Sequence, residues 1–241
     1  ERQPDCLVTV DYPGFNMKLA KLAHEKGIPV VSYIAPSAWA WHKSRAKNVA
    51  KIVDKVASIF PFEYDVYKEA GANVEFVGHP LVDIVKPKMT EAEANTFAGK
   101  QDDRKLILIM PGSRLMEIEK MLPTLLEAAK LIKKQLPEVD FVVPRAGSIP
   151  LQMLEEKIKA SGISVKITEG NNYDLFSVAD LALATSGTVT LEAALCGLGS
   201  VIVYRTNPLT YFIAKLVVNI PHIGLPNIVA GKSVLPELIQ D

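Results

Sequence analysis

Two segments of this sequence combine glycine, hydroxyl and charged side chains at a point where a strand should pass into a helix. The first, Ile109–Arg114, reads IMPGSR, and its Pro-Gly turn follows an apolar run. The N–H groups and positive dipole end of a helix suit a phosphate, and Arg114 adds a forked cation. Gly112, Ser113 and Arg114 are therefore candidate phosphate-binding residues. The alternative is an ordinary turn with a surface arginine.

The second segment, Ala184–Glu192, reads ATSGTVTLE and again follows an apolar run. Ser186, Gly187 and Thr188 supply hydroxyl and N–H groups that could cradle a diphosphate, and Gly187 permits close approach of the backbone. Glu192 lies four residues after Thr188 on the same helical face, where a carboxylate could accept both hydroxyls of a ribose. Helix capping by serine and threonine is the alternative.

A carboxylate follows the first expected strand. Asp11 opens the segment DYPGFN and would lie at the carboxyl edge of a parallel sheet, where ligands bind. A carboxylate there could remove a proton from an acceptor hydroxyl. Shaping of the Pro-Gly turn is the alternative role.

Aromatic and basic residues gather after the second expected strand. Trp39 and Trp41, which are both tryptophans of the chain, stand beside Arg45 and three lysines. Aromatic anchors next to positive charge suit an anionic lipid or a sugar phosphate. Packing of the rings between domains would also explain them. His79 ends another strand and has either a catalytic or a structural role.

Polar residues also stand at the ends of later elements. Arg205 and Asn227 could line the same phosphate site. Tyr211–Val218 is apolar and fits either a protein core or a membrane-facing patch. The sequence contains no run of 18 or more apolar residues, so no membrane-spanning helix is expected.

Strands and helices alternate along the chain, which predicts parallel sheets covered on both faces. A polar stretch at residues 85–103 predicts a linker with a short helix, and a long helix is expected over Met116–Gln135. We therefore expect an α/β fold with two Rossmann-like doubly wound domains, 1–90 and 91–241, that face each other across a cleft. The expected strands are Cys6–Val10, Ile28–Ile34, Lys55–Phe60, Val74–Val77, Lys105–Met110, Asp140–Val143, Ser164–Ile167, Leu181–Ala184 and Ser200–Tyr204.

Composition excludes some classes of protein. The 27 basic and 27 acidic residues give zero net charge, which argues against a dedicated nucleic-acid binder. Cys6 and Cys196 lie far apart, as expected for reduced thiols of a cytosolic protein, and the four scattered histidines predict no zinc site. The chain starts at Glu1 rather than methionine, which indicates missing upstream sequence.

Taken together, these motifs resemble those of lipid-A-disaccharide synthases from about Asp5 to the end of the chain. The tryptophan and Leu-Pro-Asn segments are the most specific, whereas the Ser-Gly-Thr…Glu pattern is shared with other two-domain UDP-sugar enzymes. The matching motifs are Asp11-x-Pro-x-Phe-Asn16, Pro36-Ser-x-Trp-Ala-Trp41, Pro61-Phe-Glu63, Gly78-His79, Pro111-Gly-Ser-Arg114, Ser186-Gly-Thr188 with Glu192, Tyr204-Arg205 and Leu225-Pro-Asn227.

The resemblance implies an inverting GT-B glycosyltransferase. It would move 2,3-diacylglucosamine from UDP to the 6-hydroxyl of 2,3-diacylglucosamine 1-phosphate, forming the β-1,6-linked disaccharide of lipid A. Asp11 would be the general base, and Glu192 would hold the ribose. The donor site would also include Gly112, Ser113, Arg114, Ser186, Gly187, Thr188, Arg205 and Asn227, and the acceptor and lipid side Asn16, Trp39, Trp41, Arg45 and His79.

The resemblance further implies no cofactor and no bound metal, because cations and helix ends stabilise the leaving diphosphate. It implies a cytoplasmic protein that attaches peripherally to the inner face of the inner membrane, and a homodimer is compatible with it.

The sequence departs from the family pattern in two respects. Family members begin with roughly a further strand-rich quarter and end in helices that return to the amino-terminal domain, so we expect a truncated amino-terminal domain here. Gly14 stands where some relatives carry a second acid, which leaves Asp11 the only acid of its motif.

Three rival interpretations stay open. A UDP-N-acetylglucosamine 2-epimerase would share the two-domain plan, but the tryptophan segment and the lack of further clustered acids and histidines weigh against it. A different lipid glycosyltransferase of the GT-B type would have the same donor site. A non-catalytic sugar-nucleotide-binding protein is the third rival, and the presence of Asp11 counts against it.

Overall fold

The computed structural model describes residues 4–38, 44–101, 103–205, 207 and 221–240. The described residues form two compact units, which are divided in the sequence between Val82 and Asp83. The short helix α4 (Leu81–Ile84) spans that point. The domain limit expected at residues 90 and 91 falls at the start of α5 (Glu91–Ala98). Each unit is built on its own parallel sheet.

The first unit has a four-stranded sheet whose spatial order, β1-β2-β3-β4, repeats the order of the chain. Right-handed crossovers that always lead to the next strand in one direction return every helix over the same face. The strands are β1 (Leu7–Val10), β2 (Val30–Tyr33), β3 (Lys55–Ser58) and β4 (Val74–Phe76), and the helices are α1 (Pro13–Glu25), α2 (Ser44–Ile52) and α3 (Pro61–Glu69).

One face of this sheet carries all three helices. Val30 and Val56 pack there in one buried cluster with side chains of α1, α2 and α3. Val8 and Val10 of β1 point to the opposite face and are 60% and 53% exposed. The helices that the structure describes in this unit thus cover one face, because a sheet that grows in one direction receives its crossover helices on one side.

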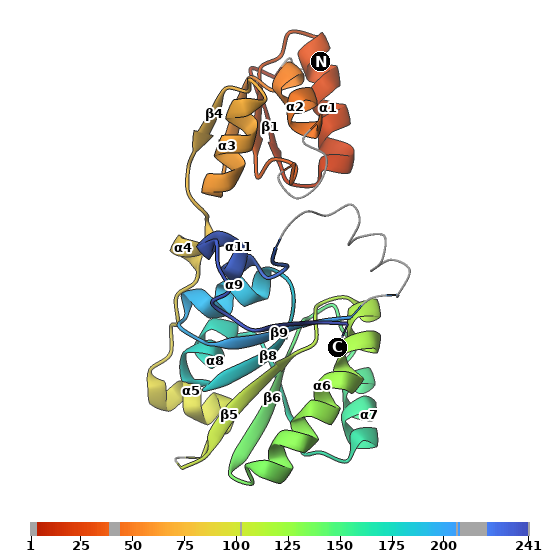
Figure 1. Ribbon diagram of the computed structural model, residues 1–241, viewed down its shortest axis with the longest axis vertical. Helices are drawn as coiled ribbons and strands as arrows, with labels where there is room; N and C mark the ends of the chain where they lie inside the picture. The colour runs from red at the N-terminus through yellow and green to blue at the C-terminus, as the bar shows by residue number, and fades with distance from the viewer. Residues whose placement is uncertain (1–3, 39–43, 102, 206, 208–220, 241) are drawn as a thin grey trace. The chain divides into compact units, whose positions relative to one another are not determined.

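The second unit reverses direction within its sheet. Its order, β10-β9-β8-β5-β6-β7, is parallel throughout, so the chain moves outward from β5 to β7 and then continues on the other side of β5. Helices α6 and α7 cover one face, and α5, α8 and α9 cover the other (Figure 1). The expected doubly wound α/β arrangement is confirmed here. The elements are β5 (Lys105–Met110), α6 (Leu115–Gln135), β6 (Val139–Arg145), α7 (Leu151–Ser161), β7 (Lys166–Glu169), α8 (Asn172–Val178), β8 (Leu181–Thr185), α9 (Thr188–Leu195), β9 (Ser200–Tyr204), α11 (Leu225–Ala230) and β10 (Glu237–Ile239).

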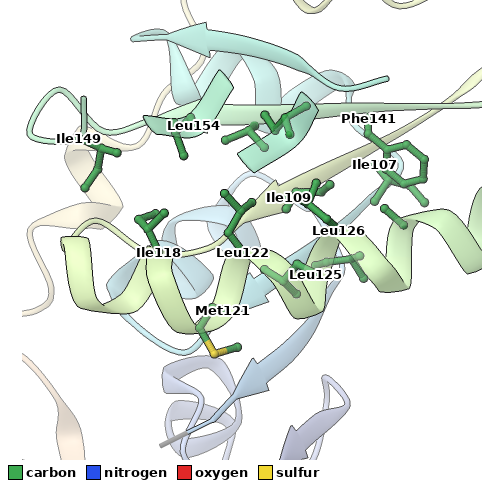
Figure 2. Close-up of a cluster of buried hydrophobic side chains, with 14 of the residues drawn as sticks. Ile107, Ile109, Ile118, Met121, Leu122, Leu125, Leu126, Phe141, Ile149 and Leu154 are labelled. Carbon is green, nitrogen blue, oxygen red and sulfur yellow. The ribbon is translucent and has the colours of Figure 1, made fainter. Parts of the chain in front are cut away.

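Helix α6 supplies much of the core on its face of the sheet. Leu122, Leu125 and Leu126 are at most 1% exposed and pack with Ile109 of β5 and Phe141 of β6 (Figure 2). Burying a leucine side chain contributes roughly 1.5–3 kcal/mol. These contacts hold the central strands in place, and the loops at the carboxyl ends of the strands are thereby positioned.

Three short helices, α3, α4 and α11, and the edge strand β10 were not predicted from the sequence. Two of these helices carry proline in the first turn, Pro61 in α3 and Pro226 in α11, where its fixed φ favours a helix start. All three helices are too short for an apolar periodicity to stand out. Among the helices that the structure describes, none is long and apolar enough to cross a membrane.

Candidate functional site

The carboxyl ends of β5 and β8 flank the place where the strand order reverses. The two strands are neighbours, and Met110 lies beside Ala184 at their ends. The crevice outside such a reversal point is where open parallel α/β sheets bind ligands. The segments 112–114 and 186–188 follow these two strands directly. The structure thus brings together the two segments that were predicted to bind phosphate.

A cavity of about 370 Å³ lies at this point, entirely within the second unit. Of its described lining residues, Arg114 is a cation, and Glu117 and Glu192 are acids. The predicted site residues that line it are Gly112, Ser113, Arg114, Ser186, Gly187, Thr188 and Glu192.

The start of α6 is already occupied by a side chain of its own first turn. Oε2 of Glu117 accepts from the N–H of Ser113 (3.0 Å) and of Arg114 (3.3 Å), and Oε1 accepts from Nη1 of Arg114 (2.7 Å). Burial opposes ionisation of Glu117, but these hydrogen bonds prevail and lower its pKa. The expectation that this turn offers free N–H groups to a phosphate is therefore corrected for Ser113 and Arg114.

The start of α9 is different. Ser186 lines the cavity, but it donates its hydroxyl hydrogen to the carbonyl oxygen of Ile223 (2.9 Å) and its N–H to that of Val203 (3.3 Å), so both of its donors support the loop. Gly187 and Thr188 are exposed, and no side chain caps the helix there. The first N–H groups of a helix lack partners within the helix. The start of α9 therefore keeps the donors that an anion needs.

Glu192 lies one turn into α9 and lines the cavity half-buried. Burial raises the pKa of its carboxyl group, and a hydrogen bond from Tyr173 of α8 limits the rise. Sequence reasoning missed Tyr173, because it belongs to a different helix and no local spacing pairs the two residues.

Asn227 does not line the cavity. It is fully buried, and its Nδ2 donates to the carbonyl oxygen of Leu235 (2.8 Å) and to Oε1 of Glu237 (2.7 Å). Its Oδ1 accepts from the N–H of Val234 and of Leu235, both at 2.8 Å. These contacts fix the connection between α11 and β10, which corrects the expectation of a direct donor-site role. Arg205 is exposed after β9 and is also absent from the described lining.

Asp11 lies at the carboxyl end of β1, exposed, in an unusual backbone conformation. Asp11 and Tyr12 have φ values of 47° and 44°, in the left-handed region that few residues other than glycine adopt. Nδ2 of Asn16 donates to the carbonyl oxygens of Val10 (3.1 Å) and Asp11 (2.8 Å). Asn16 therefore stabilises this turn from within, and Asp11 stays exposed to solvent.

Of the remaining predicted residues of the first unit, the structure describes His79 and Arg45. Nδ1 of His79 accepts from the N–H of Leu81 (3.1 Å), its ring centroid lies 4.9 Å from that of Phe60, and burial lowers its pKa. These contacts tie His79 to the turn before Leu81 and to the ring of Phe60. Arg45 is exposed on α2. Trp39 and Trp41 lie outside the described residues.

Comparison with known proteins identifies the family of this chain. The whole chain, residues 1–241, matches the family model for lipid-A-disaccharide synthetase. The chain belongs to this family. The resemblance inferred from the motifs is thereby confirmed.

Members of the family are also similar over nearly all of the chain. It is 44% identical to the lipid-A-disaccharide synthase of Geobacter sulfurreducens over 238 residues, which is 99% of this chain and 62% of that protein. It is 42% identical to the same enzyme of Nitrosococcus oceani over 240 residues, which is 100% of this chain and 62% of that protein. The chain thus spans somewhat less than two thirds of the length of these relatives.

Solved structures show the same fold in UDP-sugar enzymes. The UDP-GlcNAc 2-epimerase of Neisseria meningitidis bound to UDP-GlcNAc superposes with a TM-score of 0.63 at 18% identity, covering 95% of this chain and 67% of that one. An S. aureus MnaA–UDP co-structure gives 0.62 at 14% identity, covering 95% and 66%. At such low identities the structural similarity shows a shared GT-B fold and nothing about activity. It therefore does not support the epimerase interpretation.

Proposed function

We propose that this protein is a lipid-A-disaccharide synthase. In its complete form it would transfer 2,3-diacylglucosamine from UDP to the 6-hydroxyl of 2,3-diacylglucosamine 1-phosphate. Family membership supports the overall reaction. The observation that carries the donor half is the cavity between β5 and β8, where an uncapped helix start, Arg114 and Glu192 meet.

Each part of the donor has a matching group in this cavity. The diphosphate would lie on the N–H groups of Gly187 and Thr188 at the start of α9, where the helix dipole is positive. Arg114, whose side chain is 81% exposed, would reach its oxygens. The carboxylate of Glu192, one turn further along α9, would accept the ribose hydroxyls. These cationic and dipolar groups would stabilise the leaving UDP without a metal ion.

The acceptor half of the proposal rests on Asp11. Its carboxylate would take the proton of the 6-hydroxyl while that oxygen attacks the anomeric carbon, the bond to UDP breaks and the configuration inverts. Both substrates carry acyl chains, which would bring the enzyme to the inner face of the inner membrane. The proposal also includes assembly of the enzyme as a homodimer.

Binding of UDP to wild type and to Arg114→Ala, measured by calorimetry, tests the donor site. Loss of one charge-assisted contact costs roughly 1.5–3 kcal/mol, so we expect micromolar-to-millimolar binding that weakens about 10- to 150-fold in the variant. Lys120→Ala, which removes an exposed cation from the same helix, is the matched control and should bind like wild type.

Two results would contradict this assignment. A folded wild-type chain that does not bind UDP would remove the support that the cavity gives to the proposal. Equal UDP affinities of wild type and Arg114→Ala would show that the diphosphate lies elsewhere.

A further inference from the structure

Glu117 is an acid inside a cavity that should receive an anion, and neither the motif analysis nor the proposed reaction gives it a role. Its two carboxylate oxygens have different partners. One binds the backbone of the turn after β5, through the N–H groups of Ser113 and Arg114. The other binds the guanidinium of Arg114 at 2.7 Å. A single carboxylate thus fixes both the turn and the side chain that leaves it.

Gly112 is shaped to admit this carboxylate. Its φ is 111°, and a Cβ built there would lie 2.5 Å from Oε2 and 2.8 Å from Cβ of Glu117. Neither distance is tolerable for a real side chain. The glycine of the Pro-Gly turn therefore makes room for Glu117, and close approach of a phosphate is not needed to explain it.

Arg114 keeps donors for a second partner while it is held. A guanidinium has five N–H donors in a fixed plane, and its hydrogen bond to Glu117 uses Nη1. An arginine side chain that is 81% exposed would otherwise sample many rotamers, and ordering it on ligand binding would cost conformational entropy. Holding it beforehand removes part of that cost.

We infer that Glu117 is a positioning residue for the nucleoside diphosphate. It would hold Arg114 at the cavity so that the guanidinium meets the phosphates on the start of α9. The inference rests on the proposed function, since it assumes that this cavity binds UDP. It also distinguishes the two helix starts: the ligand would lie on the start of α9, whereas at the turn before α6 the N–H groups of Ser113 and Arg114 are taken by the carboxylate of Glu117.

The direction in which a Glu117 substitution changes UDP affinity decides the matter, because the Glu117 carboxylate also repels the negatively charged diphosphate. If positioning dominates, Glu117→Gln weakens UDP binding by about tenfold, the scale of one lost charge-assisted hydrogen bond. Uridine, which has no phosphates, binds the variant as it binds wild type. Both titrations can be followed by NMR, and Glu119→Gln, an exposed acid on the same helix, is the matched control.

A double-mutant cycle separates positioning from simple support of the loop. In an Arg114→Ala background, Glu117→Gln should cause no further loss of UDP affinity, because the residue acts through Arg114. Glu117→Asp, which keeps the charge but shortens the reach to Arg114, should weaken UDP binding in the same phosphate-specific way and serves if Glu117→Gln does not fold.

Three outcomes would overturn the inference while wild type still binds UDP. They are tighter UDP binding by Glu117→Gln, an equal loss in the Arg114→Ala background, and an equal loss for uridine. If wild type itself does not bind UDP, the proposed function fails first and the inference fails with it.

Discussion

Two effects of opposite sign determine the pKa of the Glu192 carboxyl group. Burial against the cavity wall raises its pKa, whereas the hydroxyl of Tyr173 stabilises the charged form by donating a hydrogen bond. A raised carboxyl pKa means that the folded state binds more protons than the unfolded state above the ordinary glutamate value. The contribution of Glu192 to stability is therefore full at low pH and is lost as pH rises through its folded pKa.

Removal of the Tyr173 hydroxyl should raise the pKa of Glu192 further. In Tyr173→Phe we expect the pKa of Glu192 to rise above its wild-type value, so that the loss of stability shifts to higher pH. An NMR titration of the side-chain carboxyl carbon of Glu192 measures this directly. Tyr204→Phe, at an exposed tyrosine in the same unit, should leave the titration unchanged. A pKa equal to or below wild type in Tyr173→Phe would show that the hydrogen bond does not matter.

Among single residues, the sequence could predict those that stand in the turns after strands. Arg114, Gly187, Thr188 and Glu192 all line the cavity, because the end of a strand and the start of a helix fix where they go. Glu117 carried a signal that was not used, since an acid three residues after a helix start often reaches back to cap it.

Non-local contacts gave no such signal. The hydroxyl of Ser186 is taken by a carbonyl from a later segment, and the amide of Asn227 by the connection to β10. Both hydrogen-bond partners are remote in the sequence, so local spacing could not show that these donors are used within the protein, although Ser186 still lines the cavity.

At the scale of elements, α6 depends on a stripe of buried leucines. Leu122 is fully buried in the cluster between α6 and the sheet (Figure 2). Leu131, on the same helix, is 65% exposed. A leucine-to-alanine substitution changes helix propensity equally at the two positions. Any difference in stability between the two variants therefore reports the effect of burial.

Leu122→Ala should lower the free energy of unfolding of the second unit by about 2–5 kcal/mol, because it removes apolar contacts and leaves a cavity. Leu131→Ala should change it by no more than about 0.5 kcal/mol. Urea denaturation followed by circular dichroism gives both values. Equal losses in the two variants would mean that this cluster does not carry the stability of the unit.

Periodicity predicted α6 almost to the residue, although Pro123 lies inside it. An internal proline removes a backbone hydrogen bond and costs roughly 3 kcal/mol. Pro123 is exposed, and the residues on the buried side of the helix contribute more than that cost. The apolar periodicity therefore predicted the helix correctly, although Pro123 alone would have predicted an interruption.

For the whole molecule, the proposal assigns chemistry to one unit and donor binding to the other. Asp11 lies in the first unit, and the cavity lies wholly in the second. In the full-length enzyme, Asp11→Asn should therefore slow disaccharide formation by about 10²- to 10⁴-fold, the usual contribution of a general base. Its affinity for UDP should stay at the wild-type value.

Product formation measured by mass spectrometry, alongside calorimetry with UDP, checks both halves of this prediction. Asp65→Asn, at an exposed acid on α3, is the matched control. An active Asp11→Asn enzyme would exclude Asp11 as the base, and a parallel loss of UDP affinity would show that the two units are not independent in binding.

The alternation of strands and helices was enough to predict the α/β class and the doubly wound second unit. It could not predict that the described helices of the first unit lie on one face only. Val8 and Val10 look like the buried positions of any parallel strand, and only the strand order shows that none of the helices described in this unit returns over them.

The reversal between β5 and β8 also bears on how such a protein can change over evolutionary time. The two buried clusters of the second unit contain none of the residues 112–114 or 186–188, although Met110 and Phe176 belong to a cluster and also line the cavity. Arg114 and Thr188 are exposed, so substitutions there can alter which ligand is held without disturbing the core, whereas a side chain at Gly112 would collide with Glu117. The strand order fixes where a ligand goes, and only part of each turn is free to diverge.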